Sequence, residues 1–195
     1  MLSPYEHAIV ALMTTALVVI DVQNEYVTGG LPIVHPPVFE SLAQIAAAID
    51  AANAEGLPVI LVRHQETDAE STIFVRDSEG WQIHDSVASR PHLAVLDKTL
   101  PGSFTNTNLE QLLRDRHVDS IVIVGYMTHM CVDTTTRQAN HLGLDVTVLS
   151  DATGTIDVAD DLPADLVHRV ELGVLGDGFA TVTTTSEWLE ALSTR

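Results

Sequence analysis

Cysteine and lysine are almost absent from this chain. Its 195 residues include one cysteine, Cys131, and one lysine, Lys98, and the remaining cationic side chains are arginines. One cysteine excludes an internal disulfide and is typical of a reducing compartment, so we expect a cytoplasmic protein. Where arginine is used everywhere else, a single lysine suggests a place where a compact ammonium is needed and a guanidinium would not serve.

Positive charge is scarce as well. Nine lysine and arginine residues stand against 27 aspartate and glutamate residues, which gives a formal net charge of -18. This balance opposes binding to nucleic acid or to anionic membranes through a basic patch. Residues 1–21 lack a basic segment, and Glu6 and His7 interrupt their apolar run. We therefore expect no signal peptide and no membrane span.

Apolar residues are plentiful, at 46% with a mean hydropathy of +0.19. A chain of this length and composition can bury a full core, so we expect one domain over residues 1–195. Short apolar runs alternate with amphipathic helical segments, a pattern typical of a parallel sheet covered on both faces. The prediction is a single-domain, three-layer α/β/α sandwich. The expected strands are 16–20, 58–62, 93–96, 121–124, 146–149 and 179–182, and the expected helices are 39–54, 108–116, 129–142, 162–175 and 186–192.

No glycine-rich phosphate motif follows any expected strand, so we predict no nucleotide cofactor and no other cofactor. The polar segment 67–90 is the longest one, and we expect an irregular excursion or a lid there.

Three reactive side chains stand at strand ends. Asp21 follows the first expected strand, Lys98 the third, and Cys131 opens the helix after the fourth. Taken singly, each has an ordinary explanation: a capping aspartate, a solvated lysine, a buried structural thiol. Because ligands bind beyond the carboxyl ends of parallel strands, the three could share one crevice. Together they supply a nucleophile, a base and a cation, which are the parts needed for acyl transfer.

Cys131 is expected in the first turn of the helix over 129–142, with Thr128 as the N-cap and Gly143 at the end. The helix dipole and the unpaired N–H groups there favour an anion. We therefore expect a thiol pKa below the ordinary value and backbone donors suited to an oxyanion.

The motifs that carry these residues resemble the signature segments of the isochorismatase-like cysteine hydrolases. They are DVQNEY at 21–26, DKTLPGSF at 97–104 and GYMTHMCV at 125–132. Relatives of this kind include streptothricin-hydrolase-like enzymes and N-carbamoylsarcosine amidohydrolases. The resemblance implies a six-stranded parallel sheet of Rossmann-like order and a catalytic triad of Asp21, Lys98 and Cys131. It also implies a cis peptide between Tyr126 and Met127, an oxyanion hole formed by the Met127 and Cys131 N–H groups, and a homo-oligomer, either dimer or tetramer.

The expected reaction is hydrolysis of a small-molecule amide, carbamoyl or lactam C–N bond through a thioester. Gln23, Tyr26 and Trp81 are the expected substrate contacts. Nicotinamidases of this superfamily carry an Asp-x-His metal pair after the second strand, whereas this chain has Arg63, His64, Gln65 and Glu66. We therefore predict no metal site.

Two alternatives stay open at this point. One is an isochorismatase-type vinyl ether hydrolase, although such enzymes often lack the cysteine. The other is a non-catalytic small-molecule-binding domain of the same fold.

Overall fold

A six-stranded, fully parallel sheet is the centre of the computed structural model, which describes residues 14–194. The expectation about a leader segment falls largely on residues 1–13, outside the described residues. The strand order is β3-β2-β1-β4-β5-β6. The strands are β1 (Thr14–Ile20), β2 (Val59–His64), β3 (Ala94–Lys98), β4 (Val118–Tyr126), β5 (Asp145–Gly154) and β6 (Thr181–Thr183). The predicted parallel sheet is confirmed.

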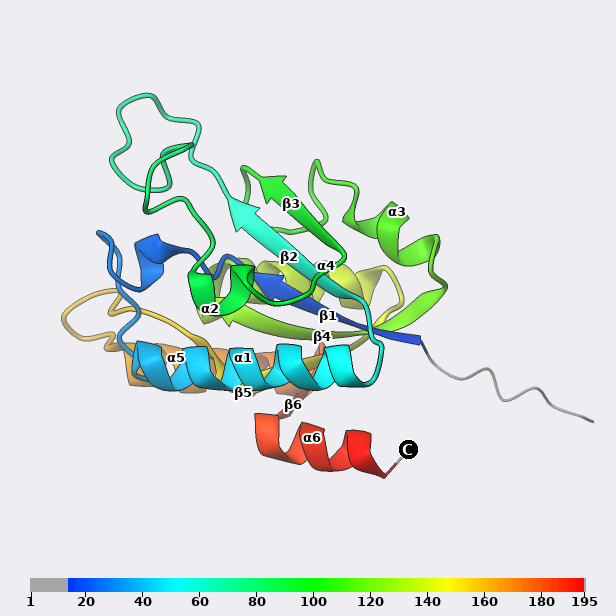
Figure 1. Cartoon of the computed structure of the whole chain (residues 1–195). Helices are drawn as coiled ribbons and strands as arrows, with labels where there is room; N and C mark the ends of the chain where they lie inside the picture. Colours follow the sequence, from blue (N-terminus) through cyan, green and yellow to red (C-terminus); the bar gives the residue numbers. More distant parts are fainter. Residues whose placement is uncertain (1–13, 195) are drawn as a thin grey trace, which may run out of the picture.

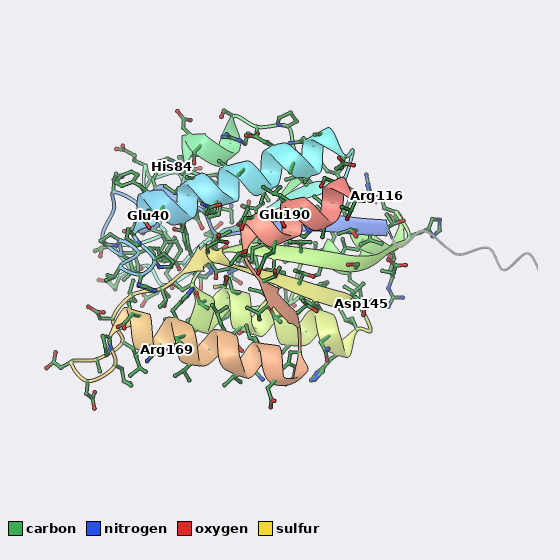
Figure 2. The ribbon with its side chains drawn as sticks, turned by 90° about the horizontal axis from the view of Figure 1, so that it is seen from below. Glu40, His84, Arg116, Asp145, Arg169 and Glu190 are labelled. Carbon is green, nitrogen blue, oxygen red and sulfur yellow. The ribbon has the colours of Figure 1, made fainter. Side chains whose placement is uncertain are left out.

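Helices cover both faces of this sheet. On one face lie α1 (Val38–Ala54), α2 (Asp85–Ala88) and α6 (Thr185–Ser193), and Figure 2 shows α1 beside α6. On the other face lie α3 (Leu109–Arg114), α4 (Asp133–His141) and α5 (Ala164–Gly178). Successive strand residues alternate between the two resulting cores: Leu17 and Val19 join the first, and Ala16 and Val18 the second. Burial on both sides is why these strands are continuous apolar runs.

The strand order reverses between β1 and β4, the two central strands. From β1 the chain moves outward to β2 and β3, then returns to place β4 on the other side of β1. Such a switch point opens a crevice at the carboxyl ends of the two strands. The residues that follow β1 and β4 therefore meet there.

The segment 65–84 between β2 and α2 lies at the same end of the sheet, where Figure 1 shows it extending beyond the tips of β2 and β3. It is largely irregular, as predicted, although α2 was not expected. Ile83 forms an isolated bridge with Gln23, which attaches the end of this segment to the chain after β1.

Within residues 14–194, no helix has both the length and the apolar character needed to cross a membrane.

Candidate active site

The carboxyl ends of β1 and β4 approach so closely that one of them needs a glycine. Gly125 pairs with Ile20 and has φ +112, and a Cβ on it would lie 2.0 Å from the Ile20 carbonyl oxygen. Asp21, the residue after β1, has φ 52, the left-handed region that non-glycine residues rarely adopt. The peptide bond between Tyr126 and Met127, directly after Gly125, is cis. The close pairing of Ile20 with Gly125 brings Asp21 beside the turn that carries Cys131.

Asp21, Lys98 and Cys131 lie together at this switch point. Lys98 Nζ is 2.7 Å from Asp21 Oδ2 and donates a hydrogen bond to Cys131 Sγ at 3.2 Å. The side chains of Asp21 and Lys98 are fully buried, and Cys131 is 6% exposed. The contact between Lys98 and Asp21 is therefore an ion pair removed from solvent, and the same ammonium also reaches the thiol.

The neighbours of Lys98 keep its side chain protonated. Burial alone would lower the pKa of Lys98, but the negative charge of Asp21 and the contact with Cys131 outweigh it and raise the pKa. The ammonium therefore stays charged and compensates the Asp21 carboxylate, which would otherwise be a costly buried ion.

The expected fall in the thiol pKa is wrong. Burial, followed by the negative charge of Asp21, raises the pKa of Cys131 to about 12, although Lys98 acts in the opposite direction. Loss of hydration outweighs the benefit of a helix terminus, which is about 2 kcal/mol even in favourable cases. At neutral pH the thiol keeps its proton and lies beside a carboxylate that can accept it.

The helix predicted over 129–142 is two elements. A π-helical turn, η2 (Thr128–Val132), carries Cys131 and precedes α4, which ends before Gly143 at φ +83. Thr128 is not an N-cap: Met127 takes that place without a side-chain cap, and Thr128 Oγ1 contacts His168 Nδ1 at 2.9 Å. Single π turns of this kind are frequent at functional sites.

His168 and Thr155 hold this turn from outside. His168 is buried on α5, and the 3.1 Å contact of its Nε2 is with the Ser150 carbonyl, which can only accept. Nε2 therefore carries the proton, and Nδ1 accepts from the Thr128 hydroxyl. Burial lowers the pKa of His168 to about 4, so this tautomer is neutral. His129, which follows Thr128 in the same turn, makes a hydrogen bond with the Thr155 hydroxyl.

Tyr26 lies near Asp21 and Cys131, and its role as a substrate contact stays a prediction. Burial and then the charges of Cys131 and Asp21 raise the pKa of its phenol well above the ordinary value. The Tyr26 ring packs 5.7 Å from the Tyr126 ring and 5.0 Å from the Phe74 ring, centroid to centroid. The phenol therefore forms part of the wall around the triad.

Gln23 differs from the prediction. It is fully buried, and its Nε2 donates to the carbonyl oxygens of His64 at 2.9 Å and Trp81 at 2.8 Å. Its Oε1 accepts from the His64 N–H at 2.8 Å. Because both ends of the amide are engaged, Gln23 joins the end of β2 to the segment 65–84 and does not present its amide to a ligand.

Trp81 packs against the protein, but its buried Nε1 makes no hydrogen bond within residues 14–194, so its role as a substrate contact stays a prediction. It is 5% exposed, and the Arg63 guanidinium lies 3.4 Å from its ring centroid. Arg63 is held in turn by Asp97 at 2.7 Å. The indole therefore packs beneath a cation instead of facing solvent, and the structure gives it a role in holding the segment 65–84.

Sequence reasoning missed two residues, Phe74 and His64. Phe74 comes from the irregular segment, has φ 50 and is 4% exposed, and its ring lies 5.3 Å from that of His64. No periodicity marks a single aromatic residue in a polar stretch as buried. His64 could have been found, because it ends a strand whose neighbour in the sheet ends at Lys98.

Among residues 14–194, no three histidine, cysteine, aspartate or glutamate side chains gather in a way that could hold a metal ion. The predicted independence from metal stays a prediction.

Comparison with known proteins agrees with this geometry. The family model described as Isochorismatase domain matches residues 15–187. The chain belongs to the isochorismatase family. A solved structure from Burkholderia xenovorans LB400 is 44% identical, with a TM-score of 0.88, and the match covers 92% of this chain and 88% of that one.

Two further members of the isochorismatase fold are informative. A cysteine hydrolase from Pseudomonas syringae pv. phaseolicola is 29% identical, with a TM-score of 0.84 and coverage of 92% of each chain. N-carbamoylsarcosine amidase from Thermoplasma acidophilum is 25% identical, with a TM-score of 0.74, and the match covers 89% of this chain and 97% of that one. The suspected relationship to amidohydrolases of this family is confirmed.

Proposed function

We propose that this isochorismatase-family hydrolase cleaves a C–N bond of a small molecule, in an amide, a carbamoyl group or a lactam, through a thioester on Cys131. The observation that carries the proposal is the Lys98 ammonium, which contacts both the Asp21 carboxylate and the Cys131 sulfur in a buried cluster. The relationship to an amidase and to a cysteine hydrolase supports the same chemistry.

The first half of the reaction forms the thioester. Asp21 accepts the thiol proton as the sulfur attacks the substrate carbonyl carbon, and Lys98 stabilises the thiolate as it forms. The N–H groups of Met127 and Cys131, on the turn that follows β4, hold the oxyanion. When the tetrahedral intermediate collapses, the C–N bond breaks and protonated Asp21 gives its proton to the leaving amine.

The second half releases the acid. Asp21, again a carboxylate, takes a proton from water as the oxygen attacks the thioester carbonyl. Collapse of this second intermediate breaks the C–S bond, and the sulfur leaves as a thiolate beside Lys98. Transfer of the proton from Asp21 to the sulfur restores the neutral resting thiol, whose raised pKa favours that return.

The high thiol pKa has a mechanistic consequence. A thiolate that is stable at rest would be a weaker nucleophile, whereas a thiol that loses its proton only during attack keeps the reactivity of a basic sulfur. The buried pair of Asp21 and Lys98 supplies the proton acceptor and the counter-charge at that moment.

An isochorismatase-type vinyl ether hydrolase is the second candidate, favoured by the family to which the chain belongs. Its chemistry is protonation of an enol ether and gives a thiol no obvious role. The contact between Lys98 and Cys131 therefore favours C–N cleavage. A homo-oligomeric state and a cytoplasmic location remain predictions from the sequence.

The test is a panel of small primary amides, carbamoyl compounds and lactams assayed for release of ammonia or of a new carboxylic acid. Cys131→Ala is expected to abolish turnover with an unchanged circular dichroism spectrum. Met130→Ala, which removes an exposed neighbouring side chain, is the matched control and should retain activity. Substantial turnover by Cys131→Ala would refute the nucleophile assignment. Hydrolysis of a vinyl ether substrate, with no C–N cleavage in any member of the panel, would favour the vinyl ether reaction.

A further inference from the structure

A half-buried imidazole with no assigned partner lies beside the triad. His64 is the last residue of β2 and pairs in register with Lys98 of β3. Residues in register on neighbouring strands direct their side chains to the same face, so the imidazole leaves the sheet on the side of the Lys98 ammonium. His64 Nδ1 is buried and makes no hydrogen bond within residues 14–194.

The position of this imidazole is fixed by its surroundings. Gln23 engages both backbone groups of His64, its N–H and its carbonyl. The ring packs edge-on against Phe74, which also contacts Tyr26, another residue of the site wall. The ring is held in place, yet one of its nitrogens has no hydrogen-bond partner within residues 14–194. This combination is typical of a residue that binds a ligand.

The imidazole is neutral at physiological pH. Burial and the nearby Lys98 ammonium lower the pKa of His64, and they outweigh the opposite effects of Asp21 and Glu66. A neutral imidazole offers one donor and one acceptor. It can therefore bind an amide, a urea or a hydroxyl, each of which also both donates and accepts.

The cations near His64 are already engaged. Lys98 is paired with Asp21, and Arg63 is paired with Asp97 and stacked on Trp81. A substrate carboxylate would find no free positive partner among these groups, and the chain itself carries a net charge of -18. Both facts act against an anionic substrate.

We propose that His64 determines specificity by binding a second, uncharged polar group of the substrate while Cys131 attacks the first carbonyl. The preferred substrates are then neutral small molecules with two polar groups, such as diamides and ureido amides, over related carboxylates. This inference rests on the proposed function and names the substrate class for that same site. A ligand without the second group leaves the buried nitrogen unpaired, which is how polar sites reject apolar analogues.

Three probes of similar size separate the possibilities: malonamide with a second amide, malonamate with a carboxylate, and butyramide with an alkyl end. Binding is measured by NMR titration of the imidazole C–H signals in the Cys131→Ala protein, where no chemistry intervenes. Malonamide should bind about tenfold to a hundredfold more tightly than either other probe and should shift the His64 signal. The active enzyme should show the same order in kcat/KM.

His64→Leu should lower affinity and kcat/KM for malonamide by about tenfold to a hundredfold and change those for butyramide less than threefold. His64→Asn, which keeps a donor and an acceptor, should recover part of the preference. His92→Leu removes an exposed histidine and is the matched control. Iodoacetamide labelling of Cys131 should be unchanged in His64→Leu, which shows that the nucleophile is intact.

Equal affinity for the three probes, tighter binding of malonamate, or an unchanged preference in His64→Leu would overturn the assignment of His64. Failure of the proposed function has a different signature, namely selective malonamide binding with no C–N cleavage. The role of His64 in specificity and the proposed hydrolysis of a C–N bond can therefore be refuted independently.

Discussion

Replacing Asp21 by asparagine should speed alkylation of Cys131 while it abolishes turnover. Lys98 Nζ lies 2.7 Å from Asp21 Oδ2 and 3.2 Å from the sulfur, so the carboxylate oxygen and the sulfur are at most about 6 Å apart. At an effective dielectric constant of about 20, two charges at that separation interact by about 3 kcal/mol. Removing the repulsion should raise the thiolate fraction about a hundredfold.

The assay is the pseudo-first-order rate of iodoacetamide labelling, which has one possible cysteine target. Because the pKa of Cys131 is raised to about 12, the rate in the unaltered protein should climb about tenfold per pH unit and reach no plateau below pH 10. In Asp21→Asn the Lys98 ammonium keeps the thiolate as its only anionic partner in the triad. Because the nucleophilicity of a thiolate falls with its pKa, by about tenfold for this change, the rate at pH 8 should be about tenfold higher.

Asp97→Asn provides the matched control, since Asp97 adjoins Lys98 in sequence but pairs with Arg63 and is partly exposed. It should leave the labelling rate unchanged. A rate in Asp21→Asn that is equal to or below that of the unaltered protein would refute the electrostatic account of the cluster. Turnover retained by this variant would refute the role of Asp21 as the base.

Two further changes test the supports of the cluster. Lys98→Met leaves the buried Asp21 carboxylate without its counter-charge and should lower the free energy of unfolding in urea by about 3–5 kcal/mol. The double variant Lys98→Met/Asp21→Asn should recover much of this loss. A loss below about 1 kcal/mol in Lys98→Met would contradict a buried ion pair. Thr128→Val removes the hydroxyl that His168 accepts from, and should lower kcat about tenfold with little change in KM, whereas Thr128→Ser should retain kcat. If Thr128→Val in a His168→Leu background lowers kcat further by the same factor, the two side chains do not act together.

The fold was predictable because strands that are buried on both faces have a recognisable sequence pattern. The runs at 16–20 and 121–124 are apolar without alternation, a composition typical of strands inside a covered parallel sheet. The meeting of Asp21, Lys98 and Cys131 was predictable for a similar reason, since parallel strands carry their carboxyl ends to one edge of the sheet.

The environment of those three residues was not predictable. The pKa of Cys131 depends on how completely water is excluded, and part of that exclusion comes from an irregular segment whose course no periodicity encodes. The place of Gln23 after Asp21 predicts a ligand contact, but a polar side chain next to a site can serve either the substrate or the scaffold. Only the positions of the backbone groups it binds distinguish the two uses.

The burial of Lys98 has a practical side as well. It is the only lysine in the chain and is 2% exposed, so acylating reagents aimed at side-chain amines have no accessible target in the folded protein. Attachment to surfaces or dyes through lysine will fail under native conditions, and any modification of Lys98 will report that the molecule has opened. The residue is thus a built-in, single-site indicator of the intact fold.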